Sequence, residues 1–129
     1  MTQRILVVDD DPSSVDGLRA LLAAWGYSVE TASNGRAALE NLAIARPTAV
    51  ITDIAMPVMN GLELLRALRT EWPAIPVIVL TGYSCLDALV ISARRHGAYA
   101  CLTKPVDVAK LKALLACALE EIRREAMAP

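Results

Sequence analysis

Four short apolar runs in this 129-residue chain end in polar residues whose types could do chemistry together. Parallel strands bring their carboxyl ends to one edge of a sheet, so side chains that follow such runs are expected to meet there. The residues concerned are Asp9, Asp10 and Asp11 after the first run, Asp53 at the end of the second, Thr81 at the end of the third, and Thr103, Lys104 and Pro105 at the end of the fourth.

Carboxylates at the ends of two neighbouring strands repel each other, and binding of a hard divalent cation commonly relieves that repulsion. Mg²⁺ fits Asp10 and Asp53, because it prefers oxygen ligands and usually takes one or two carboxylates together with water and a phosphate. The residue types therefore predict a magnesium site rather than a full calcium cage.

The same set suits phosphoryl transfer to Asp53, since aspartate can act as a nucleophile and form an acyl-phosphate. Lys104 would place a positive charge on one phosphate oxygen, and the Thr81 hydroxyl would donate a hydrogen bond to another. A strand-end aspartate often only caps a helix, and an isolated lysine is usually a solvated charge. For Asp11, which precedes Pro12, the helix cap is favoured. For the other residues, chance placement at one edge is improbable.

Apolar runs of β type alternate with stretches of helical period, which is typical of an α/β fold with a parallel sheet covered on both faces. Strands are expected at residues 4–9, 27–31, 49–53, 76–81 and 99–103, and helices at about 12–25, 35–45, 61–72, 86–96 and 107–125. We expect one domain over residues 1–125 and a frayed tail over 126–129. The sequence does not separate a complete protein from a module whose output domain follows the fifth helix.

The charge balance argues against several classes of function. With 13 Lys+Arg against 14 Asp+Glu, the chain lacks the basic surface that nucleic acid or an anionic membrane requires. Its apolar runs are far shorter than the roughly 20 residues that cross a bilayer, and its first residues lack the pattern of a signal peptide. A cytoplasmic protein is expected, with Cys85, Cys101 and Cys117 reduced, because their spacing fits neither disulfides nor zinc.

Four segments resemble the receiver domain of two-component response regulators, and the resemblance extends from Arg4 to about Glu121. The segments are ILVVDDDP at the start, VITDIAMPVMNGLELL around Asp53, VIVLTGY around Thr81 and GAYACLTKP around Lys104. The resemblance implies a flavodoxin-like (βα)5 fold, similar to that of chemotaxis receivers, with five parallel strands in the order 2-1-3-4-5 and helices on both faces.

The resemblance also implies a phosphoacceptor switch rather than an enzyme. Asp53 matches the residue that takes a phosphoryl group from a sensor histidine kinase or a phosphotransfer protein, with Mg²⁺ required and Mn²⁺ as a substitute. Asp10 matches a direct metal ligand, Asp9 its acidic neighbour that acts largely through water, and Ala55 a ligand through its backbone carbonyl. Ala55 and Tyr83 match positions that tune hydrolysis of the acyl-phosphate, and neither carries an acid that could orient water.

Thr81 and Lys104 match the pair of residues that senses phosphate in this family, and Pro105 matches a residue whose preceding peptide bond is commonly cis. Cys101 departs from the pattern, because Tyr or Phe usually stands three residues before the lysine. Tyr99 is expected on the same strand face as Cys101, but two residues further back, where it is a poor substitute. We therefore expect the aromatic part of the switch to be absent or altered.

The implied output face consists of the fourth helix, the fifth strand and the fifth helix. An output domain or partner protein would bind there, and a phosphorylation-dependent homodimer would form there. Leu114 and Cys117 widen the apolar stripe of the fifth helix, either for such a partner or for a deeper core.

Two alternative functions remain. One is a pseudo-receiver that binds partners without accepting phosphate. The other, less favoured, is a Mg²⁺-dependent phosphatase with an aspartyl nucleophile, whose second acid is replaced by Ala55. The absence of a glycine-rich phosphate loop argues against a nucleotide-binding module.

Overall fold

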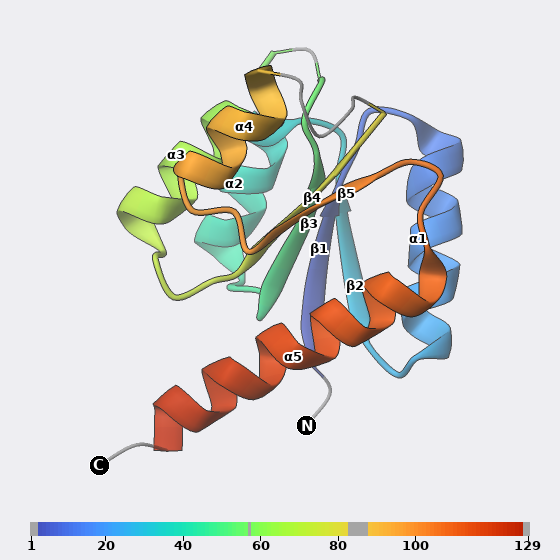
Figure 1. Cartoon of the computed structure of the whole chain (residues 1–129), viewed down its shortest axis with the longest axis vertical. Coiled ribbons are helices and arrows are strands. Elements are labelled where there is room, and N and C mark those ends of the chain that lie inside the picture. Colours follow the sequence, from blue (N-terminus) through green and yellow to red (C-terminus); the bar gives the residue numbers. More distant parts are fainter. Residues whose placement is uncertain (1–2, 57, 83–87, 128–129) are drawn as a thin grey trace.

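A sheet of five parallel strands forms the centre of the computed structural model, which describes residues 3–56, 58–82 and 88–127 (Figure 1). The strands are β1 (Arg4–Val8), β2 (Ser28–Ala32), β3 (Ala49–Asp53), β4 (Val77–Thr81) and β5 (Ala100–Thr103). The helices are α1 (Pro12–Ala24), α2 (Gly35–Ile44), α3 (Gly61–Glu71), α4 (Ala88–Arg95) and α5 (Val108–Met127). The strands lie in the order β2-β1-β3-β4-β5, so the expected α/β fold and strand order are confirmed.

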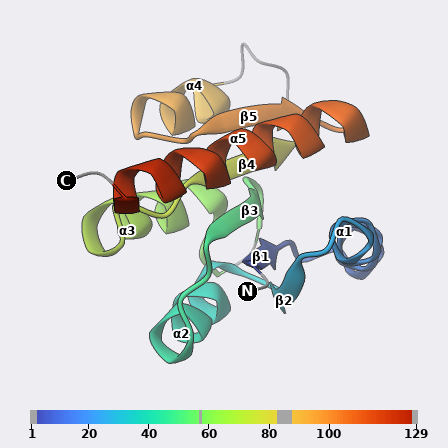
Figure 2. The ribbon, with the colours of Figure 1, turned by 90° about the horizontal axis from the view of Figure 1, so that it is seen from below.

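The sheet separates two apolar clusters, because successive side chains of a strand point to opposite faces. Ile5 and Val7 of β1 belong to a cluster with residues of α1 and α5, which we call the α1/α5 cluster. Leu6 and Val8 belong to a cluster with residues of α2, α3 and α4, which we call the α2/α3/α4 cluster. Figure 2 shows helices on both sides of the sheet. Burial on both faces explains why β1, β3 and β4 are nearly continuous apolar runs in the sequence.

Side-chain caps determine where α1 and α3 begin. The Asp11 carboxylate accepts a hydrogen bond from Ser13 N at 3.0 Å, and Pro12 occupies the first helical position, so the predicted cap is confirmed. α3 begins with a capping box, in which the Asn60 side chain accepts from Glu63 N and the Glu63 carboxylate accepts from Asn60 N. Both helices therefore start beside the carboxyl end of the strand that precedes them.

Tyr99 does not lie on the same face of the sheet as Cys101, although the two-residue period of a strand predicted that it would. β5 begins at Ala100, so Tyr99 precedes the strand and does not follow its alternation. Its ring packs against the α1/α5 cluster, and its hydroxyl donates to Glu121 Oε1 at 3.3 Å. Cys101 packs against the α2/α3/α4 cluster instead. The prediction that Tyr99 and Cys101 share a face is therefore wrong.

The apolar stripe of α5 packs against the core, with Leu111, Leu115 and Leu119 buried in the α1/α5 cluster. Leu114 packs against the α1/α5 cluster, while Cys117 is exposed. Expectations for Tyr83 and Cys85, for residues 86–87 of the fourth helix and for residues 128–129 of the tail lie outside the described residues. Among the helices of the described ranges, none has the length and apolar character needed to span a membrane.

Candidate functional site

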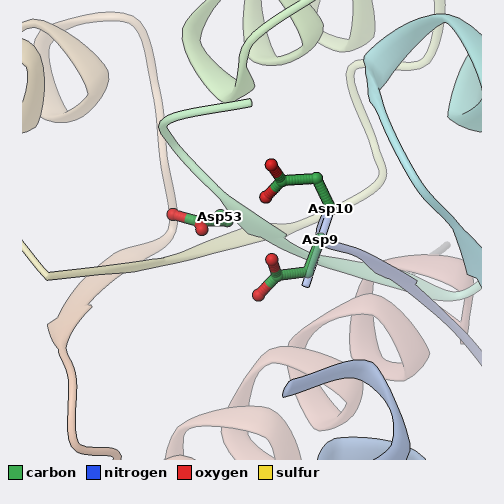
Figure 3. A group of neighbouring side chains, drawn as sticks. All are labelled: Asp9, Asp10 and Asp53. Atoms are coloured by element: carbon green, nitrogen blue, oxygen red, sulfur yellow. The ribbon is translucent and has the colours of Figure 1, made fainter. Parts of the chain in front are cut away.

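Three carboxylates meet where β1 and β3 end side by side. Asp9 and Asp10 follow β1, Asp53 ends β3, and the two strands pair with Val8 opposite Thr52. One carboxylate oxygen of each aspartate lies within 4.8 Å of the other two. Figure 3 shows the three side chains leaving these two strand ends. The structure thus brings together the three aspartates that the sequence singled out as metal-binding candidates.

Lys104 bridges two of these carboxylates. Its Nζ lies 3.1 Å from Asp9 Oδ2 and 3.2 Å from Asp53 Oδ2. Burial by itself lowers the pKa of Lys104, but hydrogen bonds to Asp9 and Asp53 and their negative charge outweigh burial and raise the pKa above its usual value. Lys104 is therefore an ammonium ion at neutral pH. Three carboxylates against one ammonium leave the site with an excess of negative charge.

Backbone amides hold the other oxygen of each bridged carboxylate. Asp53 Oδ1 accepts hydrogen bonds from Ile54 N at 2.7 Å and from Ala55 N at 3.4 Å. Asp9 Oδ1 accepts from Asp11 N at 3.0 Å. Each of these two side chains is therefore fixed at one oxygen by its own loop and at the other by Lys104. Asp10 is exposed and forms no hydrogen bond with the described residues, so its carboxylate is free to bind a ligand.

The backbone at Asp53 is held by close packing against the start of α3. A Cβ on Gly61 would lie 2.2 Å from the Asp53 carbonyl oxygen, and Gly61 N donates to Ile54 O at 2.9 Å. The Thr52 hydroxyl, which is buried, donates to the same Asp53 carbonyl at 2.8 Å. Sequence reasoning did not assign Thr52 or Gly61 to the site. The pair Asn60-Gly61 followed by Glu63 was the available signal, because it marks a capped helix that starts close to a strand end.

Thr81 ends β4, the strand next to β3, and only 1% of its surface is exposed. Leu80 pairs with Asp53, so Thr81 stands one residue beyond Asp53 in the register of the sheet. Its carbonyl accepts a hydrogen bond from Lys104 N at 2.7 Å, which ties the ends of β4 and β5 together. The Lys104-Pro105 peptide bond is cis, as the resemblance implied.

Cys101 lies on β5, three residues before Lys104, and is half-buried. Burial raises the pKa of its thiol, and the neighbouring Arg94 guanidinium opposes that shift only in part. The thiol is therefore protonated at neutral pH and is not an activated nucleophile.

The arrangement can bind a hard cation and stabilise an anionic group beside Asp53. Its ligand atoms are carboxylate oxygens, which is the donor set that Mg²⁺ prefers. Lys104 supplies a fixed positive charge at the same place, and Thr81 lies at the neighbouring strand end. These are the parts that phosphoryl transfer to a carboxylate requires.

Comparisons with known proteins agree with this geometry. The sequence profile of the response regulator receiver domain matches residues 5–116. Transcriptional regulatory protein ZraR of Klebsiella oxytoca is 44% identical over 119 residues, which cover 92% of this chain and 27% of ZraR. DNA-binding transcriptional regulator NtrC of Escherichia coli strain K12 is 40% identical over 121 residues, which cover 94% of this chain and 26% of NtrC. The chain thus spans about a quarter of the length of these curated relatives.

Among solved structures, the CheY-like response regulator receiver domain protein of Methanospirillum hungatei JF-1 superposes with a TM-score of 0.90 at 31% identity. The superposition covers 97% of this chain and 99% of that one. Sequence, strand order and the residues gathered at the strand ends lead to the same assignment: the chain belongs to the receiver domain family of two-component response regulators.

Proposed function

We propose that Asp53 is the phosphoacceptor of this receiver domain and takes its phosphoryl group from the phosphohistidine of a sensor kinase or phosphotransfer protein. The supporting observation is the Asp53 carboxylate itself, with Oδ1 bound to Ile54 N and Oδ2 bound to Lys104 Nζ. In the transfer, a new O–P bond forms to an Asp53 oxygen while the N–P bond of the donor breaks. The imidazole keeps the electron pair of that bond.

The residues at the site fit a magnesium ion. Asp10 and Asp53 would ligate it directly, Asp9 would act through water, and the Ala55 carbonyl would complete the protein ligands. The exposed, uncommitted carboxylate of Asp10 supports this assignment. When bound, Mg²⁺ or Mn²⁺ supplies positive charge that offsets the charge of the phosphoryl group.

The protein's own residues would do the rest. Lys104, already positioned between Asp9 and Asp53, would transfer one of its contacts to a phosphoryl oxygen. The Thr81 hydroxyl, at the end of the next strand, would donate a hydrogen bond to another phosphoryl oxygen. Cys101 carries no ring, so the response of β5 would involve Thr81, Lys104 and Pro105 without an aromatic rotation.

We propose one receiver domain over residues 1–125, acting as a cytoplasmic switch rather than as an enzyme that releases a product. Its output partner would bind across α4, β5 and α5. A phosphatase with an aspartyl nucleophile is not favoured, because Ala55 has no carboxyl group to act as its second acid. A pseudo-receiver is not favoured either, because Asp9, Asp53 and Lys104 are assembled with hydrogen bonds.

Intact-mass spectrometry with acetyl phosphate and Mg²⁺ tests the acceptor. We expect the parent chain to gain one phosphoryl group, and Asp53→Asn to gain none. Asp16→Asn removes an exposed carboxylate on α1 that is not one of the three grouped aspartates Asp9, Asp10 and Asp53, and it should behave as the parent does. A chelator should abolish the gain. If neither acetyl phosphate nor a phosphohistidine donor labels the parent chain, the pseudo-receiver becomes the better assignment.

Self-association through α4, β5 and α5 is a separate proposal. Sedimentation velocity of the phosphorylated and unphosphorylated chain should show a dimer only in the phosphorylated sample. An identical mass for the two samples would refute the dimer and leave the acceptor role of Asp53 untouched.

A further inference from the structure

A buried threonine stands directly before Asp53 in β3, in a row of side chains that is otherwise apolar. Thr52 pairs with Val8 of β1 on one side and with Val79 of β4 on the other, and 0% of its surface is exposed. Val8 and Val79 both belong to the α2/α3/α4 cluster. Valine has nearly the same shape as threonine, and burial of a hydroxyl costs free energy unless it forms a hydrogen bond. Packing therefore does not account for the hydroxyl of Thr52.

The Thr52 hydroxyl contacts one peptide unit, the one that joins Asp53 to Ile54. It donates a hydrogen bond to the Asp53 carbonyl oxygen at 2.8 Å. The amide of the same unit, Ile54 N, donates to Asp53 Oδ1 at 2.7 Å. Because a peptide unit is planar, a partner that fixes its carbonyl oxygen also fixes the direction of its N–H. A hydrogen bond to the carbonyl also polarises the unit, which makes its N–H a stronger donor.

The same peptide unit is confined by the residues around it. The Ile54 side chain is buried in the α2/α3/α4 cluster, and Ile54 O accepts a hydrogen bond from Gly61 N at 2.9 Å. The Asp53 carbonyl oxygen lies so close to Gly61 that a Cβ would not fit between them. The carbonyl therefore has little room to turn away from Thr52, and the Ile54 amide stays directed at the Asp53 carboxylate.

We propose that Thr52 is a positioning residue for phosphoryl transfer and acts on the Asp53 carboxylate through the peptide unit between Asp53 and Ile54. With Oδ1 held by the Ile54 amide, the plane of the carboxylate is set and Oδ2 lies 3.2 Å from Lys104 Nζ. The attacking oxygen would then meet the phosphorus from a fixed direction, and misplacement of reacting atoms by about 1 Å can cost about a hundredfold in rate. This inference rests on the acceptor role proposed above for Asp53.

Nuclear magnetic resonance of the isotope-labelled chain tests the orientation through the amide proton resonance of Ile54. Thr52→Val removes the hydroxyl, so its Ile54 resonance should move from the parent position toward that of Asp53→Ala, which has no carboxylate to accept the bond. Thr52→Ser keeps a hydroxyl and should stay near the parent position. Thr70→Val is the matched control, because Thr70 Oγ1 also donates to a backbone carbonyl, at 3.0 Å, but near the other end of α3.

The rate of labelling by acetyl phosphate at saturating Mg²⁺, followed by intact-mass spectrometry, tests the effect on the reaction. Thr52→Val should gain its phosphoryl group about tenfold more slowly than the parent, whereas Thr52→Ser and Thr70→Val should stay within about twofold of it. Thermal melting checks that each variant is folded. Thr52→Ala removes the same hydroxyl and should share the slow labelling, so the test does not depend on the valine variant alone.

An Ile54 resonance that does not change in Thr52→Val would overturn the proposal, and so would a changed resonance with labelling at the parental rate. Slow labelling of Thr52→Ser would also overturn it, because the effect would then belong to the methyl group rather than to the hydroxyl. If neither acetyl phosphate nor a phosphohistidine donor labels the parent, the acceptor role of Asp53 fails, whereas the Ile54 resonance still decides whether Thr52 orients the peptide unit.

Discussion

Asp10 differs from Asp9 and Asp53, the other two carboxylates of the acidic cluster where β1 and β3 end. It is exposed, and it has no hydrogen bond or ion pair with the described residues, whereas Asp9 and Asp53 both contact Lys104. Its charge therefore adds repulsion without a compensating contact. We expect Asp10→Asn to raise the free energy of unfolding of the metal-free protein by about 0.5–1 kcal/mol.

Urea denaturation in a chelator and in Mg²⁺ measures this effect. Added Mg²⁺ should stabilise the parent more than Asp10→Asn, because the variant has lost a ligand. Asp16→Asn serves as the control for loss of an exposed carboxylate. An Asp10→Asn variant that is less stable than the parent in the chelator would contradict the repulsion argument.

Cys101 should react more slowly than Cys117. Cys101 is half-buried and burial raises the pKa of its thiol, so little thiolate is present at neutral pH, whereas Cys117 is exposed on α5. We expect alkylation by iodoacetamide to be several-fold slower at Cys101, and its rate to keep rising through alkaline pH as the thiol ionises. Peptide mapping by mass spectrometry resolves the two sites. Equal rates at neutral pH would show that Cys101 is more accessible than its packing indicates.

The sequence predicted which residue types gather at the site, but not how they contact one another. Asp9, Asp53 and Lys104 could be identified because each follows an apolar run, and parallel strands bring such ends to one edge. The double ion pair of Lys104 and the contact of Arg94 with the Cys101 thiol depend on side-chain rotamers. No local pattern encodes these rotamers, because the packing of the whole chain selects them.

The junction of β3 with α3 depends on a residue without a side chain. A Cβ on Gly61 would lie 2.2 Å from the Asp53 carbonyl oxygen and 2.8 Å from Ile54 Cα, and both of those atoms are backbone. We therefore expect Gly61→Ala to lower the free energy of unfolding by about 2–3 kcal/mol. Gly17→Ala in α1 is the matched control, since nothing lies within 4 Å of its Cβ. It should stabilise the chain by about 0.5–1 kcal/mol through helix propensity.

Denaturant unfolding of the two alanine variants gives the comparison. Opposite signs are the expected result, because the same substitution meets backbone atoms at one position and open space at the other. A Gly61→Ala variant as stable as the parent would mean that α3 can move away from Asp53 at little cost.

All five strands could be predicted to within one residue at each end, and β1, β3 and β4 have the uniform apolar runs that are typical of buried parallel strands. The errors arose where a strand meets a loop. Tyr99 has the β-type character of a strand residue, yet β5 begins at Ala100 and the ring packs beside α5. Its partner Glu121 is 22 residues away, and such a distant contact leaves no trace in local periodicity. Leu114 is similar, since its apolar character fits both a partner face and the core.

The sheet divides the molecule into two half-cores that share the strands. Ile75 is buried in the α2/α3/α4 cluster and Ile5 in the α1/α5 cluster, on the opposite face. We expect Ile75→Val and Ile5→Val each to lower the free energy of unfolding by about 0.5–1.5 kcal/mol. Because neither side chain belongs to the other's cluster, the two losses should add to within about 0.5 kcal/mol in the double variant.

A double-mutant cycle by urea denaturation tests this additivity. All four proteins should unfold in one transition, because the shared strands make the half-cores a single cooperative unit. A coupling energy well above the error, or two separate transitions, would contradict this description.

The bridge from Lys104 to Asp9 and Asp53 has a consequence for the protein outside any signalling event. Lys104 is a counter-ion tethered to the chain, so neither dialysis nor dilution removes it, and its local concentration is set by β5 rather than by the solvent. A dissolved cation, in contrast, occupies a site only as far as its concentration allows. Lys104 therefore still neutralises part of the negative charge of Asp9 and Asp53 when divalent ions are scarce. We expect the protein to stay folded without them.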